Sequence, residues 1–514
     1  MFKPFSHYKT ILKEAIIQNI SSLLHIYLKT NIYSNTLISY TIYIMEKKAC
    51  IAMVPSPGLS HLIPLVEFAK ELVLQNHNLH VTFLIPTLGS PTPSTKALLN
   101  TLPPNMDFTI LPQANMPDLP ESIETATKMK LIVKNSIPFL HEALKSLTSQ
   151  THLIALVFGI FSTDAHYLAK QFNLLSYAFY ASGATILSFC LSLPKLDKTT
   201  SNEFFSDLIK TVSVPGCVNP FQVKDLPTPV LRERSSETYK SFLDVCQTLS
   251  LVDGVIVNTF MDLEPNVIRT LQEKDGPCVY PIGPIIQTKS SREINGSMCM
   301  TWLDNQSPNS VLFVSFGSGG TLSHDQLNEL AFGLELSGHK FLWVMRAPNK
   351  FAGSAYFIGQ NVDPLEYLPN GFFDRTKGQG LVVPSWAPQI EVLGHKSIGG
   401  FLSHCGWNST LESVVNGVPM IAWPLFGEQR MNAIILIDEL KVAVRPIVDE
   451  SDIVKREEVA NVVKRVMEGE EGLEMRKRMQ ELSDAAAAAL SEHGSSMRAL
   501  SGLSTEIAKH LSGM

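Results

Sequence analysis

Short apolar runs alternate with amphipathic helical patterns along nearly the whole chain after residue 46, and this alternation limits the fold more than any other feature. The first run, residues 50–54, is followed by a helical pattern that begins near His61 and repeats apolar residues on one face. Similar runs occupy residues 80–85 and 153–157. Strands that alternate with helices form βαβ units, so the sequence predicts a parallel sheet covered by helices.

The same alternation starts again in the second half of the chain, where we predict strands at residues 311–315, 341–344, 380–383, 400–402 and 418–422. Residues 288–297 between the halves are polar and read as a linker. We therefore expect an α/β protein with two doubly wound Rossmann-like domains, 46–287 and 298–490, and a C-terminal helix within 491–514 that could cross back to the first domain. Ligands of open α/β sheets bind beyond the carboxyl ends of the strands, which places the expected site in the cleft between the domains.

Composition excludes several classes of protein. Hydrophobic residues make up 45% of the chain and charged residues 18%, which is incompatible with a wholly disordered chain. The net charge of −6 argues against a nucleic-acid binder, which usually carries a basic excess. The seven cysteines include no CxxC pair, so neither a disulfide scaffold nor a zinc cluster is indicated, and a reducing compartment fits.

Residues 1–45 differ from the rest of the chain. They carry four lysines, one acidic residue and no arginine, and polar residues interrupt their apolar runs. A secretory signal needs a continuous apolar core, a membrane span needs roughly 18 apolar residues, and a transit peptide is rich in arginine. We expect an extension outside the fold, with a targeting segment and a membrane anchor as the alternatives.

The densest signal is a stretch of 44 residues from Trp386 to Gln429, which reads WAPQIEVLGHKSIGGFLSHCGWNSTLESVVNGVPMIAWPLFGEQ. Within it we predict a strand at 400–403, a tight turn at 404–408 and a short helix at 409–416 that ends at Gly417. A helix that starts at the end of a parallel strand presents free N–H groups and the positive end of its dipole. This arrangement suits an anion such as a pyrophosphate.

Other side chains of the stretch suit a nucleotide sugar, although each taken alone is compatible with a purely structural role. Trp386 could stack on a base, and the pair Glu428-Gln429 could bind the hydroxyls of a sugar. The chain contains neither GxGxxG nor GxxxxGK[ST], which makes a nicotinamide-dependent oxidoreductase a remote alternative.

The stretch is similar, over its full length and without a gap, to the signature of plant secondary-product UDP-glycosyltransferases, and the likeness covers nearly all of residues 46–514. A closer resemblance to the hydroquinone glucosyltransferase group is carried by short motifs, namely VPSPG at 54–58, HLIPLVEFAK at 61–70, LPKLD at 193–197, YPIGP at 280–284, SFGSGG at 315–320 and MEGEEG at 467–472. The resemblance implies a GT-B arrangement of the two domains. It also implies inverting transfer of glucose from UDP-glucose to small phenols or xenobiotics, without a cofactor or a metal ion. The expected partners are the UDP-sugar and a phenolic acceptor, with no nucleic acid and no membrane, and we expect a monomer.

The family roles carry over to individual positions of this sequence. For the nucleoside, the resemblance implies stacking by Trp386, a backbone bond from Ala387, and contacts from Gln389 and Glu412. For the phosphates it implies His404, Asn408, Ser409 and, in the facing loop, Ser318. For the sugar it implies Trp407, Glu428 and Gln429, with Ser182 close to the donor, and a terminal glutamine indicates glucose more often than galactose. Gly427, on the acceptor side, stands where the family usually has alanine.

The resemblance makes His61 the general base, because imidazole titrates near pH 6.5 and can take the proton of an acceptor hydroxyl. In the family an aspartate orients this histidine, but Gly159 stands at that position here, and Ser60 replaces a glycine beside His61. We interpret Asp164, which the family also has, as the cap of its own helix. The glycine leaves open a second hypothesis, a protein that binds a nucleotide sugar or a phenol with impaired turnover.

The compartment is predicted from a glycosylation sequon, Asn408-Ser409-Thr410, which lies inside the expected phosphate turn. A glycan at this place would block the donor. We therefore expect a cytoplasmic protein that is not translocated.

Overall fold

The computed structural model describes residues 48–116, 123–199, 210–273, 275–287, 294–349, 353 and 363–512. The predicted extension 1–45 lies outside these residues, as does most of the predicted linker 288–297. The last residues of that predicted linker belong to helix α10 (Ile294–Asp304).

The N-terminal half is built on a seven-stranded parallel sheet in the order β3-β2-β1-β4-β5-β8-β9. Its strands are β1 (Ala49–Val54), β2 (Leu79–Ile85), β3 (Met106–Ile110), β4 (His152–Gly159), β5 (Leu175–Tyr180), β8 (Gly254–Val257) and β9 (Cys278–Pro281). Its helices are α3 (Leu59–Gln75), α4 (Pro93–Leu99), α5 (Thr125–Gln150), α6 (Ala165–Gln171), α7 (Ala184–Asp197), α8 (Glu237–Leu249) and α9 (Pro265–Glu273). A small antiparallel pair, β6 (Thr211–Val212) and β7 (Phe221–Gln222), lies outside this sheet.

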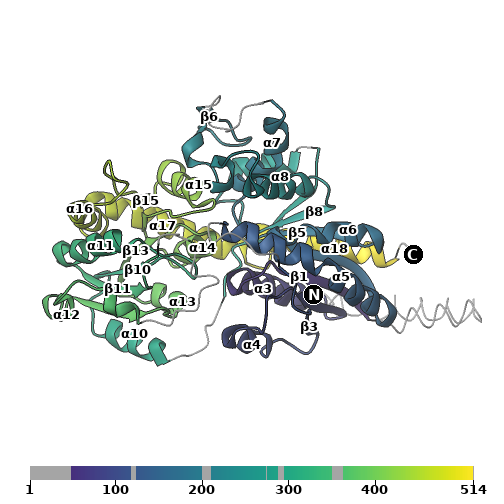
Figure 1. The fold of residues 1–514 in the computed structure, drawn as a ribbon, viewed down its shortest axis with the longest axis horizontal. Coiled ribbons are helices and arrows are strands. Elements are labelled where there is room, and N and C mark those ends of the chain that lie inside the picture. The colour runs from purple at the N-terminus through teal and green to yellow at the C-terminus, as the bar shows by residue number, and fades with distance from the viewer. Residues whose placement is uncertain are drawn as a thin grey trace, which may run out of the picture.

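The C-terminal half repeats this design with a six-stranded parallel sheet in the order β12-β11-β10-β13-β14-β15. Its strands are β10 (Val311–Ser315), β11 (Lys340–Met345), β12 (Gly380–Pro384), β13 (Ile398–Ser403), β14 (Met420–Ala422) and β15 (Ala443–Val444). Its helices are α10, α11 (His324–Ser337), α12 (Phe372–Arg375), α13 (Gln389–Leu393), α14 (Trp407–Val415), α15 (Gln429–Ile434), α16 (Arg456–Met467), α17 (Glu470–Ala489) and α18 (Ser495–Ser512). The two halves lie side by side in Figure 1.

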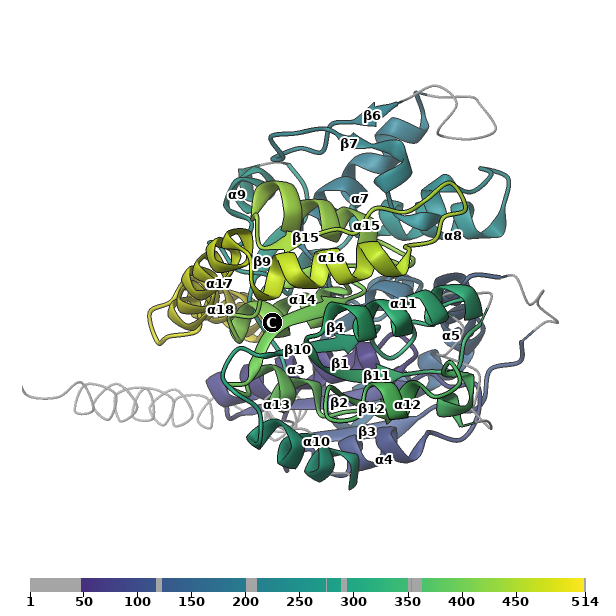
Figure 2. The ribbon, with the colours of Figure 1, turned by 90° about the vertical axis from the view of Figure 1, so that its left-hand side faces the viewer.

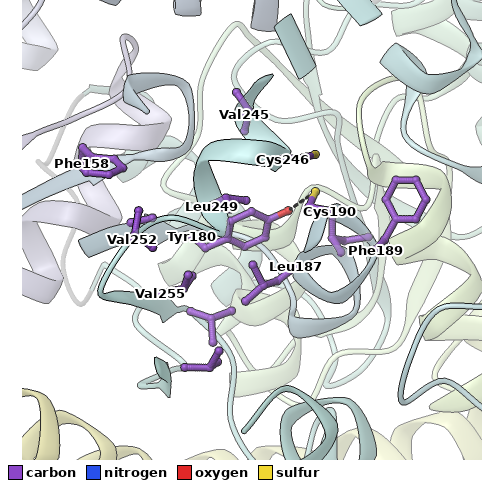
Figure 3. Packing of buried hydrophobic residues seen from close by; sticks show 14 of the residues in the cluster. Phe158, Tyr180, Leu187, Phe189, Cys190, Val245, Cys246, Leu249, Val252 and Val255 are labelled. Carbon is purple, nitrogen blue, oxygen red and sulfur yellow. Dashed lines mark hydrogen bonds between the residues drawn. The ribbon is translucent and has the colours of Figure 1, made fainter. Parts of the chain in front are cut away.

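The strands are buried on both faces, which explains their continuous apolar sequences. In β1, Cys50, Ala52 and Val54 pack into the core on one face of the sheet, whereas Ile51 and Met53 pack into the core on the other face. The first of these cores also holds Tyr180 and Cys190, whose Oη and Sγ atoms lie 3.4 Å apart (Figure 3). The prediction of an α/β fold with two Rossmann-like domains is confirmed.

Helix α18 packs against the N-terminal sheet although it follows the C-terminal domain in the chain. Leu500, Leu503 and Ile507 are buried in the same core as Ile51 and Met53. In Figure 1 the yellow end of the chain lies along the N-terminal half, beside α5, α6 and β5, and in Figure 2 helix α18 lies beside α17. Both ends of the described chain therefore contribute to one domain.

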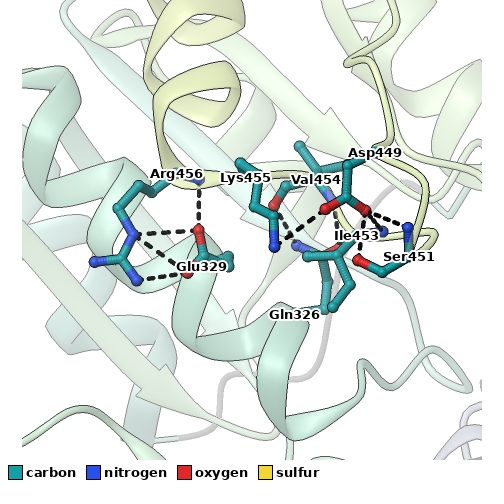
Figure 4. A network of polar contacts seen from close by, with 8 residues as sticks. All are labelled: Gln326, Glu329, Asp449, Ser451, Ile453, Val454, Lys455 and Arg456. Carbon is teal, nitrogen blue, oxygen red and sulfur yellow. Dashed lines mark hydrogen bonds and ion pairs between the residues drawn. The ribbon is translucent and has the colours of Figure 1, made fainter.

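The segment 449–456 before α16 is fixed to helix α11, which follows the loop after β10 (Figure 4). Gln326 exchanges two hydrogen bonds with the backbone of Val454, at 2.9 and 3.0 Å. Glu329 accepts from the backbone and the guanidinium group of Arg456. These contacts hold α11 against the start of α16.

Candidate active site

The loops at the carboxyl ends of the two sheets meet at the boundary between the halves. The indole Nε1 of Trp407 donates to the carbonyl of Asn258 at 2.6 Å, and Nδ2 of Asn408 donates to the carbonyl of Ser60 at 3.1 Å. Trp407 and Asn408 begin helix α14, whereas Asn258 follows β8 and Ser60 precedes His61 in α3. The predicted phosphate turn of one domain therefore touches the predicted catalytic loop of the other.

Two glycines pack closely against the ring of His404. A Cβ atom at Gly317 would lie 2.5 Å from the His404 ring, and a Cβ atom at Gly406 would overlap its Nε2. His404 is 8% exposed, and burial lowers the pKa of its imidazole to about 4. His404 is therefore neutral near pH 7, and one of its ring nitrogens carries a proton that can be donated to a phosphate oxygen.

Helix α14 begins with three backbone N–H groups, those of Trp407, Asn408 and Ser409, that bond to no other group in the described part of the chain. The first backbone bond in this turn joins the N–H of Thr410 to the carbonyl of Gly406 at 2.9 Å. Free N–H groups and the helix dipole both favour an anion at this position. Ser318, which is exposed, lies in the loop after β10 that also carries the glycine packed on His404.

Several buried polar atoms at this boundary have no hydrogen-bond partner among the described residues. They are Oγ of Ser60, Oγ of Ser182, Nδ1 of His404 and Oδ1 of Asn408. Buried polar atoms are almost always paired in folded proteins, because an unpaired one costs roughly 1–3 kcal/mol. A polar ligand placed where the two domains touch would supply bonds that these four atoms lack.

The predicted nucleoside residues form a connected group. Gln389 donates from Nε2 to Oγ of Ser409 at 2.8 Å and to Oε2 of Glu412 at 2.5 Å. Burial raises the pKa of Glu412 to about 7, and the bond from Gln389 opposes that change. Trp386 is half-buried and Ala387 is buried in the loop that leads into α13. The structure thus places Ser409 between the predicted ribose residues and the predicted phosphate turn.

Two of the predicted sugar-binding residues, Trp407 and Gln429, already form hydrogen bonds within the protein. Oε1 of Gln429 accepts from the backbone N–H groups of Leu425 and Phe426, at 2.8 and 3.0 Å, which leaves its Nε2 for a ligand. The indole N–H of Trp407 is already bonded to the other domain, so its backbone N–H is the group left for a sugar. Glu428 lies next to Gln429, and burial raises the pKa of its carboxyl group.

Gly427 lies at a contact between the domains. Its φ angle is +65°, and its carbonyl accepts from N and Oγ1 of Thr228, at 3.0 and 3.3 Å. A Cβ atom at this glycine would meet no atom within 4 Å. The positive φ, rather than a shortage of space, favours glycine here.

His61 lies in the first turn of α3, after Gly58, whose φ of +111° turns the chain into the helix. Its ring packs edge-on against Phe161, with centroids 5.4 Å apart. Within the described residues no hydrogen bond joins this half-buried ring to another side chain, and burial lowers its pKa to about 4. The imidazole is therefore neutral near pH 7, as a general base must be.

Gly159 ends strand β4 with a φ of −70°, an ordinary value for any residue. A Cβ atom at this position would lie 2.6 Å from Oγ and 2.7 Å from the backbone nitrogen of Ser56. The space beyond the strand end is thus taken by the loop that leads to His61.

The interpretation of Asp164 as a helix cap was wrong. Its carboxylate makes no capping bond to α6 and pairs with Nζ of Lys130 at 2.7 Å. Lys130 also bonds Asp244 at 2.8 Å and Thr163 at 3.3 Å. A buried lysine needs such partners, and α5 supplies this one from a position that is distant in sequence.

Three further residues shape the site and escaped the sequence analysis. Asn258 receives the Trp407 indole, Glu264 accepts the N–H groups of Ala184 and Thr185 beside Ser182, and Ser56 accepts the N–H of Phe161. Asn258 directly follows a buried strand, which is a signal that could have pointed to it. Glu264 and Ser56 gave no comparable signal.

Among residues 48–512, as far as the structure describes them, no group of three or more His, Cys, Asp or Glu side chains could hold a metal ion. The helices described are all too short or too polar to cross a membrane.

Comparison with known proteins connects this geometry to a reaction. Residues 245–483 match the family model described as UDP-glucoronosyl and UDP-glucosyl transferase. Hydroquinone glucosyltransferase of Rauvolfia serpentina is 50% identical over 89% of this chain and 98% of its own. The structure of Phytolacca americana UGT2 complexed with UDP-2fluoro-glucose and pterostilbene is 45% identical and superposes with a TM-score of 0.81, covering 90% of this chain and 100% of that one. A UDP-glucosyltransferase from Polygonum tinctorium capable of glucosylating indoxyl, in complex with 3,4-dichloroaniline, gives a TM-score of 0.82 at 45% identity, over 90% of this chain and 98% of its own.

Proposed function

Since this chain belongs to the UDP-glycosyltransferase family, we propose that it transfers glucose from UDP-glucose to the hydroxyl group of a small phenol or xenobiotic, with inversion at the anomeric carbon. The observation that supports this most directly is the set of unpaired polar groups in the cleft, from Ser182, His404 and the first turn of α14. A nucleotide sugar offers the phosphate and hydroxyl oxygens that these groups lack.

The donor binds along the C-terminal domain. Trp386 stacks on the base and Ala387 bonds its edge, while the connected group of Gln389, Glu412 and Ser409 holds the ribose and the adjoining phosphate. The neutral imidazole of His404, the amides of α14, the side chain of Asn408 and Ser318 hold the diphosphate. The backbone of Trp407, Glu428 and Nε2 of Gln429 hold the glucose, with Ser182 facing them from the other domain.

The acceptor oxygen forms the new bond to C1 of glucose while the bond from C1 to the diphosphate oxygen breaks, and UDP leaves with that electron pair. The proton of the acceptor hydroxyl passes to the neutral ring of His61. The dipole of α14 and the donor groups around His404 stabilise the negative charge that develops on the departing diphosphate. General-base assistance of this kind is worth roughly 10²–10⁴-fold in rate.

The phenolic acceptor is inferred from the relatives, one of which is named for hydroquinone and another of which was solved with pterostilbene. We find no observation that favours the alternative of a binding protein without turnover. The test is incubation with UDP-glucose and a panel of phenols, followed by mass spectrometry. Release of UDP with a matching gain of one hexose on a phenol supports the proposal, and a panel without any glucoside refutes it.

We also propose that the protein is located in the cytoplasm and acts as a monomer. The side chain of Asn408 bonds the opposite domain at 3.1 Å, so a glycan on this sequon would separate the two domains. One chain also supplies both walls of the cleft, and the site needs no second copy. Detection of a glycan on Asn408 in protein expressed in plant cells would contradict the cytoplasmic assignment.

A further inference from the structure

The groups around His61 determine how effectively its ring can take the proton of an acceptor hydroxyl. In a histidine base of the triad type, a carboxylate bonded to the second ring nitrogen fixes the tautomer and stabilises the imidazolium that forms. Here the ring meets Phe161 edge-to-face, and among the described residues no side chain forms a hydrogen bond with either of its nitrogens. The ring is thus positioned by packing alone.

The neighbouring strand end cannot supply a carboxylate. Gly159 carries no side chain, and the place of a Cβ atom is filled by Ser56. Ser56 is itself fixed, because its Oγ accepts the N–H of Phe161 at 2.9 Å and the carbonyl of the preceding Pro55 accepts from Ser162 at 3.0 Å. A side chain at residue 159 would have to displace backbone as well as a hydroxyl group.

The nearby acidic residues are engaged elsewhere. Asp164, five residues after Gly159, is paired with Lys130, which also binds Asp244. Glu428 belongs to the other domain and lies next to Gln429 in the proposed glucose site. Burial is the one influence that shifts the pKa of His61, and in the described chain no charged neighbour acts against it.

We propose that this site glucosylates hydroxyl groups that ionise readily, namely phenols with electron-withdrawing substituents, and discriminates strongly against aliphatic alcohols, because Gly159 and Ser56 leave His61 without an orienting carboxylate. The inference rests on the proposed function and names the acceptor class of the same site. A phenolate reaches the cleft without a proton, so O–C1 bond formation and UDP departure proceed with no transfer to His61. An alcohol must give its proton to His61, whose imidazolium forms in a half-buried place without a carboxylate beside it.

The test is a series of acceptors of similar size, from strongly acidic phenols through unsubstituted phenol to benzyl alcohol, at one pH and saturating UDP-glucose. We expect kcat/KM to fall by at least about 10²-fold across the series, in line with the size of general-base effects. The variants His61→Ala and His61→Gln should lose about 10²-fold or more with unsubstituted phenol and less than about 3-fold with the most acidic phenol. Two variants are used so that a folding defect in one does not decide the result.

Asp164→Asn is the matched control, because its carboxylate is bonded to Lys130 and not to His61. In this variant, kcat/KM should change with acceptor acidity as it does in the unmodified chain. Equal kcat/KM for phenols and benzyl alcohol overturns the inference, as does an equal loss for all acceptors in the His61 variants or a changed dependence in Asp164→Asn. A series that yields no glucoside with any phenol overturns the proposed function, and the inference with it.

Discussion

At the scale of single residues, two glycines determine the shape of the phosphate site. Cβ atoms at Gly317 and at Gly406 would both overlap the Cε1–Nε2 edge of the His404 ring, so a side chain at either position would push the ring away. The sequence showed that a glycine-containing turn meets a helix. It did not show that a second glycine, in a strand loop almost ninety positions earlier in the chain, closes on the same ring.

Gly406→Ala isolates this steric effect, because the φ of Gly406 is −62° and alanine adopts it without strain. The added methyl group would displace His404 and should weaken UDP binding by about 10-fold or more, which corresponds to the loss of a hydrogen bond to a charged group. Isothermal titration calorimetry with UDP measures this change in affinity. Gly502→Ala, in helix α18 with no atom within 4 Å of the new Cβ, is the control and should bind UDP normally. Equal affinities for both variants would contradict the role of His404.

A second residue, His166, carries a prediction about pH. Its ring is fully buried, neither nitrogen has a partner among the described residues, and burial lowers its pKa, with Lys170 acting in the same direction. Between the lowered pKa of His166 in the native protein and about 6.5 in the unfolded chain, the unfolded chain binds more protons, so this residue reduces stability as the pH falls through that range. His166→Phe, which can pack against Phe158, should melt at a higher temperature than the unmodified chain, and the gain should be larger at pH 5.5 than at pH 7.5. A gain that does not change with pH would refute the assignment.

Among the helices and strands, those features were predictable from the sequence that depend on residues close together in the chain. The strands were predictable because burial on both faces requires continuous apolar runs, and Gly417 ends its helix with a φ of +67°, as expected. The ends of the helices and strands were predicted less accurately than their positions along the chain. Helix α3 begins at Leu59, before His61, and the predicted strand 418–422 shortens to β14 (Met420–Ala422). The pairing of Asp164 with Lys130 was not predictable, because it joins two helices whose relative placement the sequence does not state.

The loop before α15 gives an element-scale prediction. Thr228, from the N-terminal domain, holds the carbonyl of Gly427 next to the proposed glucose residues. Thr228→Val keeps the backbone bond and loses the hydroxyl bond. It should raise KM for UDP-glucose by about 2- to 10-fold, the range of one hydrogen bond, while the affinity for UDP alone stays constant. Thr270→Val, whose hydroxyl bonds its own helix, is the control and should change neither value. A parallel loss of UDP affinity in Thr228→Val would indicate general loosening of the domain contact.

At the scale of the whole molecule, the chain crosses between its domains twice, and the second crossing ends in α18. Leu503 of this helix is fully buried against the N-terminal core. Leu503→Ala should destabilise the protein by about 2–5 kcal/mol, the usual range for a buried leucine, without changing the affinity of the folded protein for UDP. Thermal unfolding and UDP titration measure the two effects. A melting temperature that does not change would show that α18 contributes little to the N-terminal domain.

If the two domains together form an inverting glucosyltransferase, the stereochemistry of the product must show it. UDP-glucose carries its glucose in α linkage, so attack from the side of His61, opposite the departing UDP, must yield a β-glucoside. The decisive measurement is the anomeric configuration, determined by NMR, of the glucoside formed from UDP-glucose and hydroquinone. We predict a β-glucoside formed with one UDP per glucose transferred. An α-glucoside, or consumption of UDP-glucose without a phenolic product, would contradict the account.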